Sequence, residues 1–222
     1  MTSLLRKISM EQYNEQYFQQ EWVEKKEPTL QRYLDFLPPA LSKTASCLDI
    51  GCSTGRLVKL LRGKGYSNTF GIDIALPALT IGKAGGLDLA LASAEKGLPF
   101  ATNAFDVIFF LDVVEHLTRP YEALVEIRRI LKDNGLLVIT TPNAGSIIRL
   151  LLGKRWYALK DKTHLYYFDS FSMTYILAKA GYRIEKKHTY SGLSLAPLNF
   201  VLERSQQGGQ LTILAKKADG QL

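Results

Sequence analysis

LDIGCSTGRL, residues Leu48 to Leu57, places an aspartate inside an apolar run and follows it with two glycines four positions apart. The run before the glycines has the character of a short strand, and the segment from Arg56 onward has the apolar spacing of a helix. The glycines indicate a tight turn between the two, and a glycine lets a ligand approach the backbone closely because it has no Cβ. Two explanations remain open at this point, namely a plain strand–helix turn and a turn that holds a nucleotide-like cofactor.

Beyond this turn, strand-like and helical segments alternate along the chain as far as Pro142. Strands are predicted in NTFGIDI, LDLALAS, FDVIFFLDVV and LLVITTP, with helical segments between them. Such alternation is typical of parallel strands joined by helical crossovers. We therefore expect an α/β fold with a doubly wound sheet and helices on both of its faces.

Two segments fall outside this alternation. Residues 1–40 carry no strand pattern and are interpreted as an N-terminal helical cap, which leaves 41–222 as the main domain. Residues 143–168 form an insertion, and its part 147–162 mixes apolar side chains with arginine and lysine, as surface-lying amphipathic elements do. The insertion is expected either to pack as a lid on the site or to make a peripheral membrane contact.

The composition sets limits on partners and compartment. The net charge of +7 favours an anionic partner, although solvated lysines explain it as well. The two cysteines form neither a Cys-x-x-Cys motif nor a cluster with histidine, so we predict no disulfide framework, no zinc site and no metal ligands. Cysteine usage fits a reducing cytoplasm. The longest apolar runs are too short to span a bilayer, so we expect a cytoplasmic protein, with membrane association as an alternative.

A second carboxylate favours the cofactor interpretation. Asp73 ends the stretch GIDI, about 20 residues beyond the glycine turn, where a carboxylate can accept both hydroxyls of a ribose. The dinucleotide fingerprint is incomplete, because Ser53 and Arg56 stand at its second and third glycine positions. A smaller adenosine ligand without a pyrophosphate is therefore expected, and a nicotinamide dehydrogenase ranks last.

LDIGCSTG resembles the first motif of class I S-adenosylmethionine-dependent methyltransferases, and four further stretches resemble the later motifs in the same order. These stretches are GIDI, SAEKGLPF, FDVIFFLDVVEHL and ILKDNGLLVITTPN. The resemblance covers about Tyr13 to Gly181, and it is to the subgroup with ubiquinone-biosynthesis and bacterial cell-surface-glycan-associated enzymes. It implies a Rossmann-like seven-stranded sheet, mostly parallel with the last strand antiparallel.

The same resemblance implies an enzyme that transfers a methyl group from S-adenosyl-L-methionine to an O or N atom of a small molecule by in-line displacement. S-adenosyl-L-homocysteine would be its product. Asp73 would hold the ribose hydroxyls, Ile74 would pack on the adenine and Asp49 would face the amino group of the methionine part. Ser53 and Ser93 depart from the glycine and aspartate usual at their positions. The full set expected at the cofactor is Asp49, Gly51, Cys52, Ser53, Thr54, Gly55, Asp73, Ile74, Ser93, Ala94, Glu95, Leu111, Asp112, Val113 and Tyr17.

Three residues are candidates for catalysis. His116 follows the fourth strand in VVEHL and has a side-chain pKa suited to a base, or else it anchors the loop. His164 precedes the aromatic run LYYF after the insertion, and Glu115 either orients the substrate or caps the next helix. Two other functions stay open, a tRNA-modifying methyltransferase and a cofactor-binding module without activity. Because the basic residues are scattered, nucleic acid is the less favoured partner.

Overall fold

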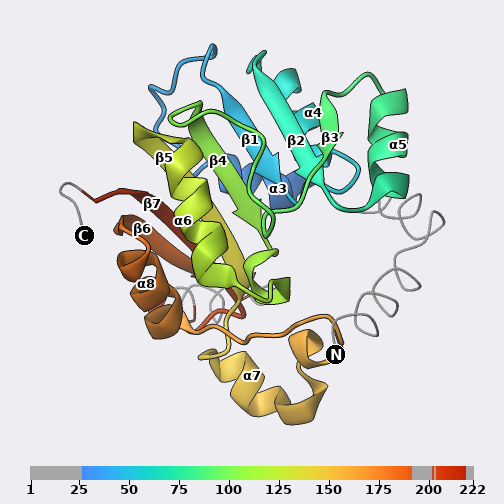
Figure 1. Ribbon diagram of the computed structural model, residues 1–222. Coiled ribbons are helices and arrows are strands. Elements are labelled where there is room, and N and C mark those ends of the chain that lie inside the picture. Colours follow the sequence, from blue (N-terminus) through green and yellow to red (C-terminus); the bar gives the residue numbers. More distant parts are fainter. Residues whose placement is uncertain (1–26, 192–201, 203, 219–222) are drawn as a thin grey trace.

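The computed structural model of the chain describes residues 27–191, 202 and 204–218. Within these residues seven strands form one sheet in the order β3-β2-β1-β4-β5-β7-β6 (Figure 1). β1 to β5 run parallel, and β7 pairs antiparallel with both β5 and β6. The predicted fold class is thereby confirmed, including the antiparallel last strand. The strands are β1 (Cys47–Ile50), β2 (Thr69–Asp73), β3 (Leu89–Leu91), β4 (Phe105–Leu111), β5 (Leu131–Pro142), β6 (Tyr182–Tyr190) and β7 (Gln210–Lys217).

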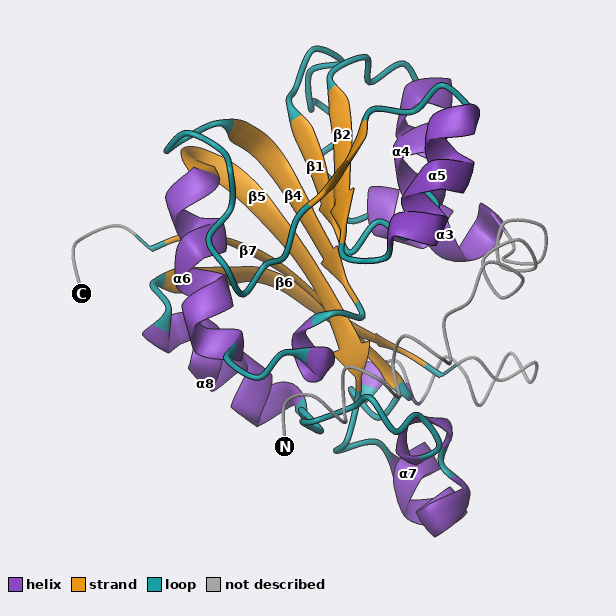
Figure 2. Ribbon diagram, turned by 45° about the vertical axis from the view of Figure 1, so that its right-hand side comes forward, coloured by secondary structure: helices purple, strands orange, loops and turns teal. Residues whose placement is uncertain are grey.

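Helices cover both faces of the sheet (Figure 2). One face is covered by α3, α4 and α5, and the other by α6 and α8. The α-helices are α3 (Glu27–Leu34), α4 (Arg56–Gly63), α5 (Leu76–Ala84), α6 (Pro120–Ile130), α7 (Ile147–Leu152) and α8 (Ser170–Lys179), and 3-10 turns lie at Val114–His116, Gly153–Arg155 and Tyr157–Leu159.

The apolar sequence of β4 follows from burial on both faces. Val107 and Phe109 pack into the core beneath α3 and α4. Ile108 and Phe110, which point to the other face, pack into the core beneath α6 and α8. All four side chains are fully buried. A central parallel strand has no solvent-facing side, so its sequence loses the usual polar alternation.

The insertion consists of an exposed part and a buried part. Among its described residues, the helix α7 has no buried side chain and projects away from the sheet (Figure 1). The segment after α7 returns to the protein, where Trp156 and Ala158 are fully buried. No helix in the described part of the chain has the length and apolarity needed to cross a membrane. Most of the cap expected at residues 1–40 lies outside the described residues, and only its part 27–40, which includes α3, is described.

The strand order reverses beside β1, at the carboxyl edge of the parallel strands. From β1 the chain proceeds outward to β2 and β3, then returns to β4 on the other side of β1. In open parallel sheets, ligands bind where the strand order reverses in this way. The loops that follow β1, β2 and β4 meet at this edge and carry most of the predicted site residues.

Candidate active site

The glycine turn after β1 has an unusual backbone conformation. Gly51, Ser53 and Gly55 have φ angles of 81°, 49° and 80°, all in the left-handed region. A Cβ on Gly51 would lie 2.3 Å from Cγ2 of Val113, so this position requires glycine for space as well as for conformation. Ser53 adopts the left-handed backbone conformation although it has a Cβ. This conformation costs free energy in residues other than glycine and is typical of functional turns.

Asp73 connects the end of β2 to the glycine turn. One carboxylate oxygen accepts a hydrogen bond from the backbone N–H of Ser53 at 2.7 Å. The other oxygen accepts one from the backbone N–H of Ala75, also at 2.7 Å. The carboxylate therefore lies across the mouth of the turn, where the sequence places the ribose of an adenosine ligand.

Two aliphatic side chains at the same edge are exposed to an unusual degree. Ile74, directly after β2, is 72% exposed, and Leu91, at the end of β3, is 60% exposed. Both flank Asp73, since Leu91 is its register partner in β3. The two aliphatic side chains suit the flat adenine base of adenosine, and the carboxylate of Asp73 suits its ribose diol. The residues present thus fit a nucleoside cofactor.

The remaining residues expected at the cofactor fall into two groups. Asp49 and Thr54 are buried beneath the turn, and Cys52 is 5% exposed. Burial is the main cause that raises the pKa of the Cys52 thiol, followed by the charges of Asp49 and Asp73, so the thiol stays protonated. Tyr17 lies outside the described residues.

The loop after β3 holds the second group, and here the structure gives Glu95 a different role from the one expected. Its carboxylate accepts hydrogen bonds from the backbone N–H groups of Thr118 at 2.6 Å and Arg119 at 3.2 Å. It thereby fixes the segment that leads into α6. Ser93 is half-buried and Ala94 is buried next to it, so these two remain the candidates for the adenine edge.

At the end of β4, the backbone turns sharply through Asp112. This residue has a φ of 55°, and one of its carboxylate oxygens accepts hydrogen bonds from Oγ1 of Thr140 at 2.9 Å and from Nε2 of Gln210 at 2.5 Å. Asp112 is therefore tied to β5 and β7. Leu111 and Val113 on either side of it are half-buried. Val113 lies beside Gly51 of the glycine turn, whereas Leu111 packs against the core beneath α3 and α4.

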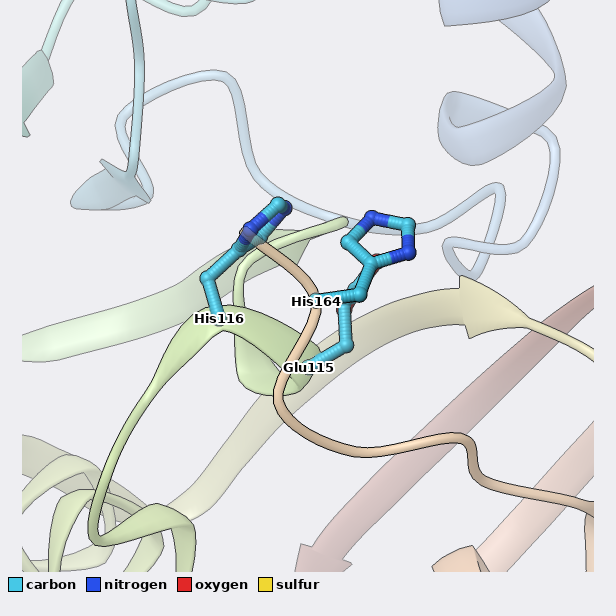
Figure 3. A group of neighbouring side chains, drawn as sticks. All are labelled: Glu115, His116 and His164. Atoms are coloured by element: carbon cyan, nitrogen blue, oxygen red, sulfur yellow. The ribbon is translucent and has the colours of Figure 1, made fainter. Parts of the chain in front are cut away.

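The three residues predicted for catalysis lie together, although 47 positions separate two of them (Figure 3). Glu115 and His116 belong to the 3-10 turn after β4, and His164 comes from the end of the insertion. Ligand-type atoms of the three side chains all lie within 4.8 Å of one another. The two imidazole rings meet edge to face with their centroids 4.6 Å apart.

Backbone hydrogen bonds hold the insertion against this turn. The carbonyl oxygen of Glu115 accepts from the N–H groups of Leu165 at 2.8 Å and Tyr166 at 3.2 Å. The hydroxyl of Tyr157 donates to Oε1 of Gln210 at 3.0 Å, which attaches an earlier part of the insertion to β7. These contacts place His164 beside His116.

Three residues that the sequence did not single out orient the two histidines. Nδ1 of His164 lies 2.8 Å from the carbonyl oxygen of Ala158, and Nδ1 of His116 lies 2.8 Å from Oγ1 of Thr163. The Thr163 hydroxyl donates to a carboxylate oxygen of Asp161 at 2.6 Å. The pattern DKTH contains both Asp161 and Thr163 just before His164, but no local sequence feature indicates that they reach His116.

Burial changes the protonation of this cluster. Glu115 is 1% exposed, and burial raises the pKa of its carboxyl well above the usual range, with the charge of Asp112 acting in the same direction. Burial also lowers the pKa of His116, and the neighbouring His164 lowers it further. Neutral imidazole is therefore the stable form of His116 near pH 7, which allows the ring to accept a proton.

Comparison with known proteins gives a consistent picture. A family model described as a methyltransferase domain matches residues 20–187. A ubiquinone biosynthesis O-methyltransferase of Thiobacillus denitrificans is 28% identical over 130 residues, which cover 56% of this chain and 55% of that protein. The chain spans only 36% and 43% of the length of the first two curated relatives that it matches.

Solved structures of low sequence identity share the fold. An S-adenosylmethionine-dependent methyltransferase from Archaeoglobus fulgidus superimposes with a TM-score of 0.70 at 21% identity, covering 90% of this chain and 98% of that one. A methyltransferase-like chain of Haloferax volcanii, solved in complex with the Trm112 methyltransferase activator, superimposes with a TM-score of 0.71 at 17% identity. That match covers 87% of this chain and 90% of the other.

Proposed function

The chain belongs to the methyltransferase-domain family, and from this membership we propose that it transfers a methyl group from S-adenosylmethionine to an oxygen or nitrogen atom of a small molecule. The observation that carries the proposal is the position of Asp73, whose carboxylate spans the end of β2 and the glycine turn after β1. A ribose diol is the partner that this carboxylate suits, since two adjacent hydroxyls donate to two oxygens.

Our proposal gives each part of the cofactor a place among the described residues. Asp73 would hold the ribose, and Ile74 with Leu91 would enclose the adenine, because these exposed aliphatic side chains flank the carboxylate. The backbone of the glycine turn would face the methionine part, where the left-handed conformation of Gly51 and the absence of a Cβ allow close approach. The methionine end would then point toward the loop after β4.

The cofactor supplies an activated methyl group, so the protein needs to align the acceptor and exclude water. Asp112 fixes the loop after β4 to β5 and β7, and this loop carries Glu115 and His116. The insertion contacts the same region through Tyr157, which donates to Gln210, and through Leu165, whose N–H donates to the carbonyl oxygen of Glu115. The acceptor would lie between the glycine turn and the two imidazoles.

His116 is the proposed base for the acceptor proton. The Thr163 hydroxyl donates its one hydrogen bond to Asp161. In the short contact with Nδ1 of His116 the Thr163 oxygen must therefore accept, which places the imidazole N–H on Nδ1. The lone pair then lies on Nε2, the nitrogen directed away from Thr163. A neutral imidazole in this tautomer can take a proton from a hydroxyl or amine.

A direct test uses S-adenosylmethionine with a labelled methyl group and a panel of phenols, sugars and amines. We expect transfer of the label to at least one hydroxyl or amino compound by the wild-type protein, and loss of that transfer in Asp73→Asn. If the protein binds the cofactor and methylates no member of a broad panel, the alternative of a binding module without activity is supported instead. If it does not bind the cofactor, the proposal fails altogether.

The exposed part of the insertion supports a second element of the proposal, contact with an anionic membrane. Leu150 and Leu151 of α7 are 74% and 78% exposed, and Arg149, Lys154 and Arg155 lie close to them in sequence. Apolar side chains ringed by basic ones are typical of elements that lie in a lipid interface. This arrangement would bring the candidate site close to a lipid-borne acceptor.

Liposome co-sedimentation tests this contact. Replacing Leu150 and Leu151 by glutamate removes two apolar side chains, each contributing roughly 1.5–3 kcal/mol when buried, so pelleting with anionic vesicles should fall by at least about tenfold. Phe171→Glu is a matched control, because Phe171 on α8 is also 78% exposed. Equal pelleting of all three proteins, or no pelleting of the wild type, would remove the membrane contact from the proposal.

Methylation of RNA is the second candidate function. The net charge of +7 and the fold shared with the Haloferax volcanii chain that binds a methyltransferase activator favour it. Binding to bulk tRNA that weakens steeply as salt rises would support this candidate. Weak binding that hardly changes with salt would leave the small-molecule acceptor as the better proposal.

A further inference from the structure

The buried carboxylate of Glu115 forms no ion pair within the described part of the chain, and Thr141 is the one neighbouring side chain that stabilises its charge. Neither of its oxygens makes a hydrogen bond of normal geometry, although the residue is 1% exposed. Burying an ionisable group without a partner is costly, so a native protein retains such a group mainly where something else binds it.

Other perturbed carboxylates of this protein are compensated. Glu126 pairs with Arg129 at 2.7 Å, and Asp106 pairs with Lys132 at 2.8 Å. These pairs lie nearer the surface, where compensation is least needed. The contrast with Glu115 indicates that its cluster is built to receive a positive charge from outside the chain.

Both histidines of the cluster present a lone pair. His116 carries its proton on Nδ1, because the Thr163 hydroxyl donates its hydrogen bond to Asp161 and can only accept from the ring. His164 likewise carries its proton on Nδ1, because the carbonyl oxygen of Ala158 can only accept. In this tautomer each ring has its lone pair on Nε2, and Nε2 of His164 lies 3.8 Å from a carboxylate oxygen of Asp161. In metal sites, ligating histidines are oriented in just this manner, by donation of the other ring N–H to a carbonyl or carboxylate system.

We propose that Glu115, His116 and His164 bind a divalent first-row transition-metal ion through one carboxylate oxygen and two imidazole Nε2 atoms (Figure 3). The ligand atoms lie within 4.8 Å of one another, so an ion placed among them needs only small side-chain adjustments. Two nitrogens and one oxygen suit ions such as Mn²⁺, Co²⁺ or Zn²⁺ better than Mg²⁺, which prefers oxygen ligands alone. Metal ligands were not predicted from the sequence, because His164 lies far along the chain from Glu115 and His116.

Three protein ligands leave coordination positions open, which is typical of catalytic rather than structural sites. The role of the ion in methyl transfer rests on the proposed function, whereas its binding does not. An ion here would bind the hydroxyl oxygen of an acceptor and lower its pKa, so the proton would pass to solvent. The oxygen then forms the bond to the methyl carbon while the carbon–sulfur bond breaks and leaves its electron pair on sulfur. The proposal therefore favours an oxygen acceptor over a nitrogen acceptor. With the ion bound, Nε2 of His116 would be a metal ligand, and the role of base proposed above would apply to the metal-free protein only.

Cobalt(II) is a suitable probe, because its visible absorption changes when nitrogen ligands bind it. The full-length protein is treated with EDTA, dialysed and titrated with CoCl₂, and with MgCl₂ in parallel. We expect one cobalt ion per chain with a new visible band, and binding at least about tenfold weaker in Glu115→Gln and His164→Gln. His188→Gln is the matched control, because His188 is the remaining histidine and its ring packs against Phe36 and Tyr190 instead.

Circular dichroism of each variant establishes that it is folded, and Glu115→Gln keeps the shape of the side chain while removing its charge. No cobalt uptake by the wild type, or full uptake by a folded Glu115→Gln/His164→Gln double variant, would overturn the metal site. Titration of the same metal-free protein with S-adenosylhomocysteine tests the nucleoside site separately. A protein that binds the nucleoside and no metal would retain the proposed function and lose this inference.

Discussion

Replacement of Asp73 by asparagine is expected to weaken the binding of S-adenosylhomocysteine by about 10- to 150-fold. The carboxylate already orients two backbone N–H groups, those of Ser53 and Ala75, at 2.7 Å each. An amide has only one oxygen, so the variant cannot keep both of these contacts and accept from a ribose as well. Loss of one hydrogen bond to a charged group amounts to about 1.5–3 kcal/mol, which gives this range of affinity.

Isothermal titration calorimetry of the wild type and the variant measures this difference. Asp88→Asn is a matched control, because Asp88 is a carboxylate before β3, at the opposite edge of the sheet, and pairs with Arg62. The control should bind the nucleoside as the wild type does. If Asp73→Asn binds within twofold of the wild type while its melting temperature is unchanged, the assignment of Asp73 to the ribose is refuted.

Three further predictions follow from local geometry. Gly51→Ala should lower the free energy of unfolding by about 1–3 kcal/mol, because its φ is 81° and the new Cβ meets Val113; thermal unfolding measures this, and an unchanged midpoint contradicts it. Asp169→Ala should remove the capping box of α8 and cost about 1 kcal/mol at pH 7. Hydrogen bonds from Ser172 lower the pKa of Asp169, so its contribution is fully present above about pH 4 and is lost as pH falls through the lowered value. Urea unfolding at pH 7 and pH 3 should therefore show a smaller deficit of the variant at the lower pH. Thr163→Val should weaken cobalt binding by about 10- to 100-fold and leave nucleoside binding intact, and equal cobalt affinity in both proteins would argue against the tautomer assigned to His116.

The fold could be predicted because its determinants are local in the sequence. The alternation of apolar strands and amphipathic helices fixes a parallel sheet, and the glycine turn with Asp73 lies at the edge where we propose that the cofactor binds. Element ends were less certain: the sequence placed the fifth strand at LLVITTP, whereas α6 ends at Ile130 and β5 already begins at Leu131. Leu131 is fully buried and pairs with Phe105 of β4, a tertiary contact that overrides its helical spacing.

Individual residues of the candidate site could be proposed from the sequence, but their spatial arrangement could not. His116 and His164 were candidates on chemical grounds, yet only the return of the insertion to the turn after β4 brings them together. The protonation of both rings depends on Thr163, Asp161 and the carbonyl of Ala158, contacts that no sequence periodicity encodes. Glu95 was expected at the adenine, but its carboxylate instead holds the segment before α6.

The central claim is that the glycine turn and Asp73 hold S-adenosylmethionine, and thermal unfolding with added nucleosides tests it most directly. S-adenosylhomocysteine or S-adenosylmethionine at about 100 times its dissociation constant should stabilise the protein by about 2.7 kcal/mol. For a chain of this size that corresponds to a rise in melting temperature of about 5–10 °C, and NAD should produce no rise. Stabilisation by NAD alone, with no shift from either sulfur nucleoside, would contradict the account.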